Sequence, residues 1–219
     1  MATQKPQVRS TFATPVLVHF LPVAQEVNTD LRPLVLERMS SNGQSQNGAP
    51  ANGSQSRAHG WRSSSDFEIW GGMHAETLYR VMRELADSAT ATRSGGRVSL
   101  DWKVSACAAV RGQGEYRDLT ARPGAMWSAV YFIDDGYQKS DDEALGGEVE
   151  LGDPRGALPA MVAPTLAFRI PGGLTAGGVE AIRPQTGMII LHPSWLPRGE
   201  RRYDGTAQRV TVEFDLAPP

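Results

Sequence analysis

Glycine and proline divide the chain into many short apolar runs, and this punctuation constrains the fold more than any other feature of the sequence. The 219 residues include 23 Gly and 15 Pro, which interrupt helices and mark turns. The apolar runs between them span residues 14–20, 97–110, 126–133, 147–151, 166–170, 188–191 and 208–216. Most of these runs have the length of a strand, so the pattern indicates a sandwich or jelly-roll body.

Two helices are expected near the start of the chain. The first begins at Asn28, whose side chain suits an N-cap, and it has Pro33 near its start. Its apolar residues are Leu31, Leu34, Val35 and Met39. The second helix spans about residues 73–89, and the spacing of its apolar residues predicts one buried face, formed by Leu78, Val81, Met82 and Leu85.

The whole chain, residues 1–219, is expected to form a single domain with a flexible low-complexity loop at 40–57. That loop consists mainly of Ser, Asn, Gln, Gly and Ala and has no large apolar residue, so it cannot offset the entropy lost on ordering. The predicted fold class is α+β. Its body is expected to be a β-sandwich or jelly-roll, preceded by two or more helices.

Charge and composition exclude several classes of protein. The net charge of -2 and the pI of about 6.1 do not suit a nucleic-acid-binding protein. No apolar run approaches the 18 or more residues of a membrane span, and residues 1–12 lack the apolar stretch of a signal peptide. The single Cys107 excludes an internal disulfide and a multi-cysteine zinc site. We expect a cytoplasmic protein with no nucleic-acid or membrane partner; a homo-oligomer stays open.

Taken one by one, the reactive side chains form no recognisable catalytic motif. His74 and Glu76 lie two residues apart on a predicted helix, so they point in different directions and are expected to face solvent. His192 ends a predicted strand, where a structural role is favoured over a functional one because no partner ligand is near in sequence. Cys107 lies in an apolar strand and is expected to be an inert small hydrophobe.

Three groups of segments, in order along the chain, resemble one known family. The first is Gly60-Trp-Arg-Ser63 with Asp66-Phe67; the second is Gly124-Ala-Met-Trp-Ser-Ala-Val-Tyr-Phe132 with Gly146-Gly147 and Asp153-Pro-Arg155; the third is Gly187-Met-Ile-Ile-Leu-His-Pro-Ser-Trp-Leu-Pro197 with Gln208-Arg-Val-Thr-Val-Glu-Phe-Asp-Leu216. Their order and spacing resemble a bacterial family of 2-oxoglutarate/Fe(II)-dependent oxygenases, over almost the whole chain outside 40–57. The resemblance implies a double-stranded β-helix preceded by helices, with Fe(II) and 2-oxoglutarate as the family's cofactors.

The same resemblance places other residues where the family has its iron ligands. The family pattern before the Ser-x-Val-Tyr strand is like His-x-His-Pro, and Thr120 and Arg122 stand at its two histidines. Arg198 stands at the distal histidine, after Pro-Ser-Trp-Leu-Pro. Threonine is a poor ligand for ferrous iron, and arginine has no lone pair to offer. Thr120, Arg122 and Arg198 are therefore degenerate metal-ligand positions, so no bound metal, no cofactor and no catalytic residue are expected.

The residues that bind the cosubstrate in the family match this sequence more closely than the metal ligands do. Arg209-Val-Thr211 resembles the Arg-x-Ser pattern that holds the distal carboxylate of 2-oxoglutarate, and Tyr131 could add a hydrogen bond. With Arg122 and Arg198, these residues are candidates for binding the cosubstrate, a small dicarboxylate or another anion. An ordinary cross-strand ion pair at Arg209 is the open alternative.

Three arginines inside one barrel would repel one another, so their charges must be neutralised. Internal carboxylates are the favoured solution, with Glu115, Asp118 and Glu213 as candidates, and a small dianion is the other.

Two main functions follow from these residues. The leading hypothesis is a pseudoenzyme of the oxygenase family that has lost its iron site and acts as a binding or structural homologue. The alternative is an active 2-oxoglutarate/Fe(II)-dependent dioxygenase that acts on an unknown substrate through non-standard ligands, first among them His192, Glu115 and Asp118. A metal-free enzyme of another class ranks lower, because no triad or pair of carboxylates is visible.

Overall fold

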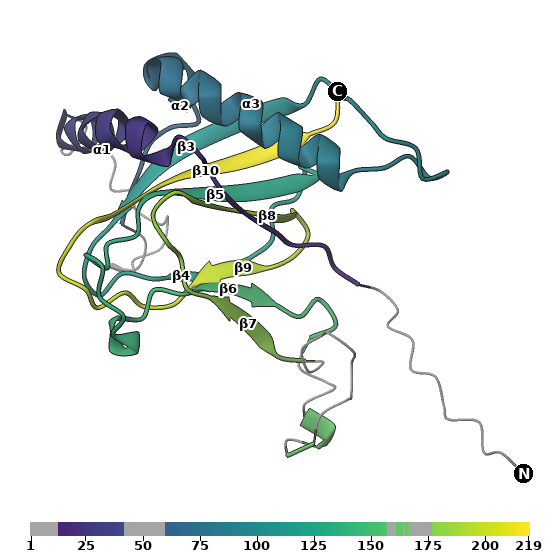
Figure 1. Ribbon diagram of the computed structural model, residues 1–219. Coiled ribbons are helices and arrows are strands. Elements are labelled where there is room, and N and C mark those ends of the chain that lie inside the picture. The colour runs from purple at the N-terminus through teal and green to yellow at the C-terminus, as the bar shows by residue number, and fades with distance from the viewer. Residues whose placement is uncertain (1–12, 42–59, 157–160, 164, 167–176) are drawn as a thin grey trace, which may run out of the picture.

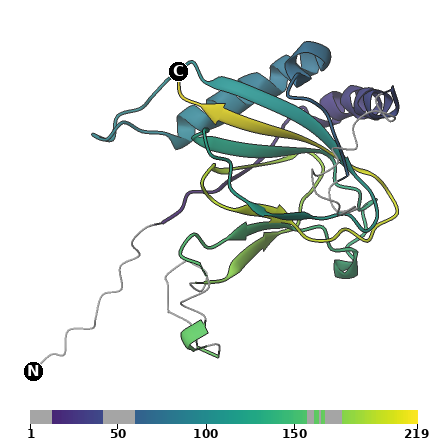
Figure 2. The ribbon, with the colours of Figure 1, turned by 180° about the vertical axis from the view of Figure 1, so that it is seen from behind.

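The chain forms three layers, in which helices cover one sheet and that sheet faces a second, smaller sheet (Figures 1 and 2). The computed structural model describes residues 13–41, 60–156, 161–163, 165–166 and 177–219. The helices are α1 (Ala24–Ser41), α2 (Phe67–Trp70) and α3 (Gly72–Ala89), with a short 3₁₀ turn, η1 (Glu143–Leu145). None of the helices in these ranges has the length and apolar character that crossing a membrane requires.

The larger sheet has six strands in the order β1-β8-β5-β10-β3-β2, and the smaller has four in the order β4-β9-β6-β7. All their pairings are antiparallel. The larger sheet consists of β1 (Leu17–Phe20), β2 (Trp61–Arg62), β3 (Lys103–Arg111), β5 (Trp127–Asp134), β8 (Met188–Pro193) and β10 (Arg209–Ala217). The smaller consists of β4 (Arg117–Thr120), β6 (Val149–Gly152), β7 (Val179–Ile182) and β9 (Arg198–Glu200). Two facing antiparallel sheets with these crossovers agree with a jelly-roll.

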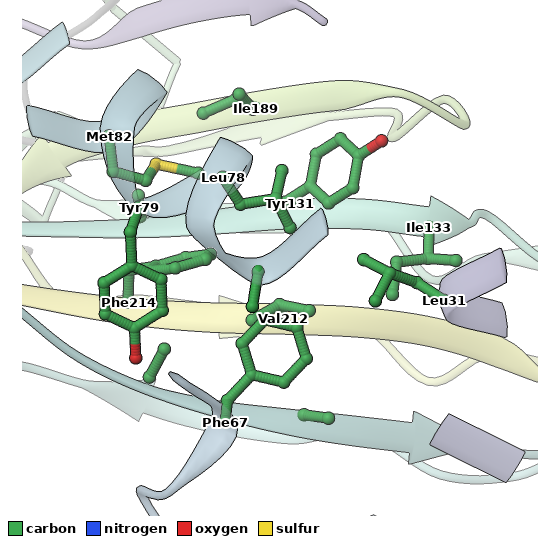
Figure 3. Close-up of a cluster of buried hydrophobic side chains, with 14 of the residues drawn as sticks. Leu31, Phe67, Leu78, Tyr79, Met82, Tyr131, Ile133, Ile189, Val212 and Phe214 are labelled. Carbon is green, nitrogen blue, oxygen red and sulfur yellow. The ribbon is translucent and has the colours of Figure 1, made fainter. Parts of the chain in front are cut away.

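The main hydrophobic core lies between the helices and the larger sheet (Figure 3). On α3, Leu78 and Met82 are buried as predicted, whereas Val81 and Leu85 of the predicted face are only partly buried. Tyr79, which was not predicted, is buried, and its ring packs edge-on against Phe214 of β10 at 5.5 Å. The helix spans Gly72–Ala89, close to the predicted 73–89. The apolar face of α3 packs against the helix-facing residues of β3, β5, β8 and β10. Burial of these apolar side chains holds α3 on the sheet.

The start of α1 was predicted wrongly. The helix begins at Ala24, so Asn28 lies inside it and is not its N-cap. The Asn28 side chain is buried and its Oδ1 accepts a hydrogen bond from the hydroxyl of Tyr131 at 2.6 Å. Pro33 therefore also lies well inside the helix, where it cannot donate to the carbonyl one turn earlier. Packing of Leu31 and Val35 against the sheet compensates for that lost bond.

Six of the seven predicted strand runs overlap observed strands, which are β1, β3, β5, β6, β8 and β10, and all but β1 extend one or two residues beyond the predicted end. The strand predicted at 97–110 was too long at its start, because β3 begins only at Lys103. The seventh run, 166–170, lies outside the described residues except for Leu166, which is not in a strand. Of the loop predicted at 40–57, residues 40 and 41 belong to α1, and the rest lies outside the described residues.

Alternation along β10 divides its side chains between two environments. Val210, Val212 and Phe214 face the helices and join the main core. The intervening residues Thr211 and Glu213 face the smaller sheet and are buried. The space between the two sheets therefore receives polar side chains from the strand at the centre of the fold.

Two methionines of α3 test how much the packing against the sheet stabilises the protein. Met82 is fully buried and Met73 is 71% exposed, so the same change to alanine removes core packing at one position only. We expect Met82→Ala to lower the free energy of unfolding by about 2–5 kcal/mol and Met73→Ala to change it by less than about 0.5 kcal/mol. Urea unfolding followed by circular dichroism measures both, and equal losses would show that α3 is not packed as described.

Candidate functional site

Glu213 lies at the centre of a polar cluster between the two sheets. It comes from β10, and only 5% of its side chain is exposed. A buried carboxylate needs partners, because its desolvation is costly. The strand alternation of β10 points it away from the apolar core and toward β4 and β9 of the smaller sheet.

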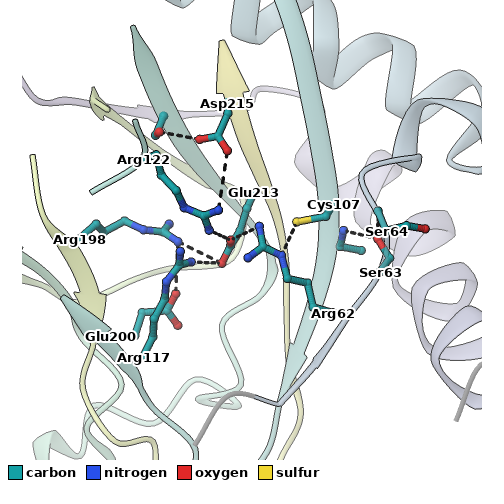
Figure 4. A network of polar contacts seen from close by, with 12 residues as sticks. Arg62, Ser63, Ser64, Cys107, Arg117, Arg122, Arg198, Glu200, Glu213 and Asp215 are labelled. Carbon is teal, nitrogen blue, oxygen red and sulfur yellow. Dashed lines mark hydrogen bonds and ion pairs between the residues drawn. The ribbon is translucent and has the colours of Figure 1, made fainter. Parts of the chain in front are cut away.

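Five arginines direct their guanidinium groups at the two carboxylate oxygens of Glu213, and Figure 4 labels four of them. They come from β2, β3, β4, β9 and the segment after β4, so both sheets contribute. Oε1 is contacted by Arg117 Nη1 at 2.5 Å, Arg198 Nη2 at 3.0 Å and Arg111 Nη2 at 3.2 Å. Oε2 is contacted by Arg122 Nη2 at 3.0 Å and Arg62 Nη2 at 3.2 Å. We call these six residues the Glu213 cluster.

The cluster shifts the pKa values of its members in both directions: those of Arg62 and Arg111 are raised by nearby carboxylates against the effect of burial. Burial alone would raise the pKa of Glu213, but the surrounding guanidiniums outweigh it and hold the pKa well below its usual value. Burial and repulsion from Arg198 lower the pKa of Arg117, and burial and repulsion from Arg117 lower that of Arg122. Glu213 is thus firmly ionised, and its neighbours feel each other's charge.

A second buried carboxylate, Glu200 of β9, lies beside the cluster. Its Oε2 is 3.2 Å from Arg111 Nη1 and 4.0 Å from Arg209 Nη1, and its Oε1 is 3.9 Å from Arg198 Nη2. These are ion pairs by distance, but neither oxygen of Glu200 has an aligned hydrogen bond within the described residues. Glu200 therefore lowers the charge of the interior without satisfying the donors around it.

The structure brings together the three residues that the family resemblance sets at the metal positions. Thr120 of β4 pairs in register with Arg198 of β9, and Arg122 follows two residues after Thr120. All three line one small cavity of about 10 Å³, together with His192 and Glu213. That volume is about enough for a single water molecule. Side chains, and above all guanidiniums, fill this part of the barrel.

His192 contributes an uncharged imidazole to the same cavity. Its ring is 1% exposed, and burial together with the charges of Arg198, Arg117 and Arg122 lowers its pKa to about 4. Nδ1 is 2.9 Å from the carbonyl oxygen of Pro193, so the neutral ring donates there, and Nε2 has no hydrogen-bond partner in the described residues.

The donors around these positions do not fit a ferrous ion. Glu213 is saturated by guanidiniums, and Asp215 accepts from Ser128 at 2.6 Å and lies 3.9 Å from Arg122. Within the described ranges, no three His, Cys, Asp or Glu side chains are grouped so that they could hold a metal. Iron sites of oxygenases use two histidines and one carboxylate with open positions, whereas several permanent cations would here repel a divalent ion.

Of the candidate anion-binding residues, Arg209 and Thr211 lie on the same face of β10, toward the smaller sheet, whereas Tyr131 lies on the helix side of the larger sheet. Arg209 is 1% exposed, donates from Nε to the carbonyl of Asp135 at 3.0 Å and from Nη1 to the carbonyl of Gly147, and stacks on Tyr203. Thr211 faces the sheet interior, and its hydroxyl lacks a hydrogen-bond partner among the described residues.

Tyr131 points to the helix side, where it bonds to Asn28. Gly147 has a φ of +78°, and a Cβ there would lie 2.5 Å from Arg209 Nη2, so this glycine makes room for the guanidinium.

A second, larger cavity of about 290 Å³ lies next to the cluster. Its lining includes Arg62, Arg111 and Arg117, with Asp118 and Thr120. Arg62, Arg111 and Arg117 were not recognised in the sequence as site residues. The signal was present only in composition, because 19 of the 22 basic residues are arginine, whose fork binds carboxylates and phosphates better than lysine.

The other candidate residues from the sequence analysis each have a partner close by in the structure. Glu115 Oε2 accepts from the backbone N–H of Gly112 at 2.7 Å, and His74 Nε2 lies 2.7 Å from Asp30 Oδ2 on α1. Cys107 is buried, its Sγ accepts from Arg62 Nε at 2.8 Å, and burial together with the charge of Glu213 raises the pKa of its thiol. A thiol with a raised pKa is a weak nucleophile, as expected for an inert cysteine.

Part of the chain, including most of this site, matches a known protein family. Residues 107–215, which contain most of the Glu213 cluster, match the family described as "Putative 2OG-Fe(II) oxygenase". No curated protein matches the sequence.

Several solved structures share the fold at low sequence identity. A Pseudomonas putida prolyl-4-hydroxylase is 16% identical, with 94% of this chain and 92% of that chain covered and a TM-score of 0.55. A Trichoplax adhaerens prolyl hydroxylase, solved with a peptide fragment of hypoxia inducible factor, is also 16% identical, with 93% and 83% covered and a TM-score of 0.62. HygX from Streptomyces hygroscopicus, with nickel and 2-oxoglutarate bound, is 15% identical, with 94% and 83% covered and a TM-score of 0.56. The fold is therefore that of the double-stranded β-helix oxygenases.

Removing the charge of Glu213 tests whether the cluster depends on it. Glu213→Gln leaves five guanidiniums around a neutral amide, so the free energy of unfolding should fall by about 3–5 kcal/mol. Glu84→Gln is the matched control, because Glu84 pairs with Arg80 on the exposed face of α3 and should matter by less than about 0.5 kcal/mol. Denaturant unfolding at neutral pH measures both, and a stable Glu213→Gln variant would contradict this role.

His192 should make stability depend on pH in a defined window. Its pKa is about 4 in the folded protein and near 6.5 in the unfolded chain, so only the unfolded chain binds the proton between these values. Stability is then fully present above pH 6.5 and falls by about 3 kcal/mol as the pH drops to 4. His192→Asn should remove this slope while His74→Asn keeps it; an unchanged slope in His192→Asn would refute the assignment.

Proposed function

We propose that this member of a 2OG-Fe(II) oxygenase family works without an iron centre, as a metal-free binding or structural homologue. The proposal rests on one observation: Arg122 and Arg198, at positions that the resemblance assigns to iron ligands, converge on the buried carboxylate of Glu213. A guanidinium cannot ligate a metal, and in this cavity it places a fixed positive charge where the family pattern places a histidine.

The ligand that we propose is a small dicarboxylate or another small anion. In the interior, the five guanidiniums of the Glu213 cluster contact three carboxylates, those of Glu213, Glu200 and Asp215. HygX holds 2-oxoglutarate together with nickel on the same fold. In this chain we propose that guanidiniums, which pair with carboxylates, take the place of the metal in holding the anion.

The alternative, an active 2-oxoglutarate/Fe(II)-dependent dioxygenase with non-standard ligands, has one observation in its favour. His192, with its unpartnered Nε2, lines the same cavity as Glu213 and Asp215. Both carboxylates already pair with arginines or Ser128, so iron would have to displace these contacts. Glu115 and Asp118, the other proposed ligands, do not line this cavity.

Metal content and turnover separate the two functions. Protein incubated anaerobically with Fe(II) and then desalted should contain far less than one iron per chain, and it should convert no 2-oxoglutarate to succinate above a protein-free control. An active oxygenase of the same fold serves as the positive control. Stoichiometric iron that is lost in His192→Asn, together with succinate formation, would establish the alternative and refute the metal-free proposal.

A further inference from the structure

The Glu213 cluster offers more hydrogen-bond donors than its carboxylates can accept. Each guanidinium has five N–H groups, so five arginines supply about 25, whereas one carboxylate has about four lone-pair sites. Five guanidinium nitrogens already contact Glu213. On Arg111, which is 6% exposed, Nε and Nη1 have no hydrogen-bond partner among the described residues, although Nη1 lies 3.2 Å from Glu200.

Positive charge is also in excess around the Glu213 cluster. The five guanidiniums contact three carboxylates, those of Glu213, Glu200 and Asp215. Arg209, 4.0 Å from Glu200, is a sixth guanidinium of this interior. Asp118 of the neighbouring cavity and Glu115, whose charge acts on Arg111, are two further carboxylates, so six guanidiniums face five carboxylates. Buried charges in stable folds are compensated, so a further anion would complete the site.

A cavity of about 290 Å³ borders three of these arginines. Arg62, Arg111 and Arg117 all line it, and all three also contact Glu213. The hydroxyl-bearing Thr120 and the small Ala109 complete much of the wall. The volume is near the lower limit of small-molecule sites. The more exposed Arg62, with 43% of its side chain accessible, leaves this cavity open to a ligand.

We propose that this cavity, lined by Arg62, Arg111 and Arg117, binds a small dianion that carries a phosphate group or two carboxylates. Guanidinium forks match the oxygens of both groups, and the hydroxyl of Thr120 adds a neutral donor. The site is separate from Arg209 and Thr211, which do not line the cavity. The inference rests on the proposed function in that the ligand binds without metal.

Binding is tested by calorimetry and thermal unfolding in metal-chelating buffer, with inorganic phosphate and succinate as separate probes. At one hundred times its dissociation constant, the bound probe should raise Tm by about 5–10 °C, and added salt should weaken binding. Binding of phosphate alone would define a phosphate site, and binding of succinate alone a dicarboxylate site.

Variants of Arg62 locate the site. Arg62→Gln should weaken binding about 10–100-fold, because it removes a charge-assisted fork, and Arg62→Lys should weaken it less. The half-exposed position makes both variants compatible with folding, which near-ultraviolet circular dichroism checks. Arg80→Gln is the matched control: it removes one arginine from the exposed face of α3 and should leave binding unchanged.

Failure of this inference differs from failure of the proposed function. If neither probe binds in the absence of metal, or if Arg62→Gln binds as well as the original protein, the inference is overturned while the iron measurement stands by itself. If a probe binds only after Fe(II) is added, both the inference and the metal-free function are refuted.

Discussion

The attraction between one buried carboxylate and the guanidiniums around it joins β4 and β9 of the smaller sheet to the larger sheet, beside a hydrophobic cluster in which Val149 packs against Val130 and Phe132. Glu213 belongs to the larger sheet, and Arg117 and Arg198 to the two neighbouring strands of the smaller one. Strands β4 and β9 have few apolar residues to bury, so ion pairs rather than hydrophobic contacts hold them against β10. Burying so many charges is costly unless each charge has a partner at good geometry. This requirement fixes the positions of the charged side chains between the sheets.

The parts of the fold that apolar burial controls could be predicted, and the parts that charge controls could not. Periodicity located α3, and apolar runs located β5, β8 and β10. Strands β4 and β9 carry no such run, because their inward side chains include Arg117, Arg198 and Glu200. The start of α1 was misjudged because Asn28 bonds to Tyr131, 103 residues away, and no local pattern reports such a contact.

The candidate site, too, could be predicted only in part. The family resemblance singled out Thr120, Arg122 and Arg198, and the structure gathers them around one cavity. Glu115, Asp118 and Glu213 were equal candidates for neutralising the arginines, and only the inward orientation on β10 selects Glu213. Arg62 escaped notice because it lies in β2, far along the chain from the other members, and Arg111 because it ends the apolar strand β3.

The position of β10 in the chain has a consequence for folding kinetics. Three of the partners of Glu213, Arg111, Arg117 and Arg122, lie 91 to 102 positions earlier in the chain. Strand β10 inserts between β3 and β5 near the end of the chain. Until that strand arrives, the arginines have no common counter-charge and stay hydrated. Contacts of such long sequence separation form late and slow the folding of a domain. Interactions that are absent from the transition state act mainly on the unfolding rate, so the cluster should prolong the lifetime of the folded protein more than it hastens folding.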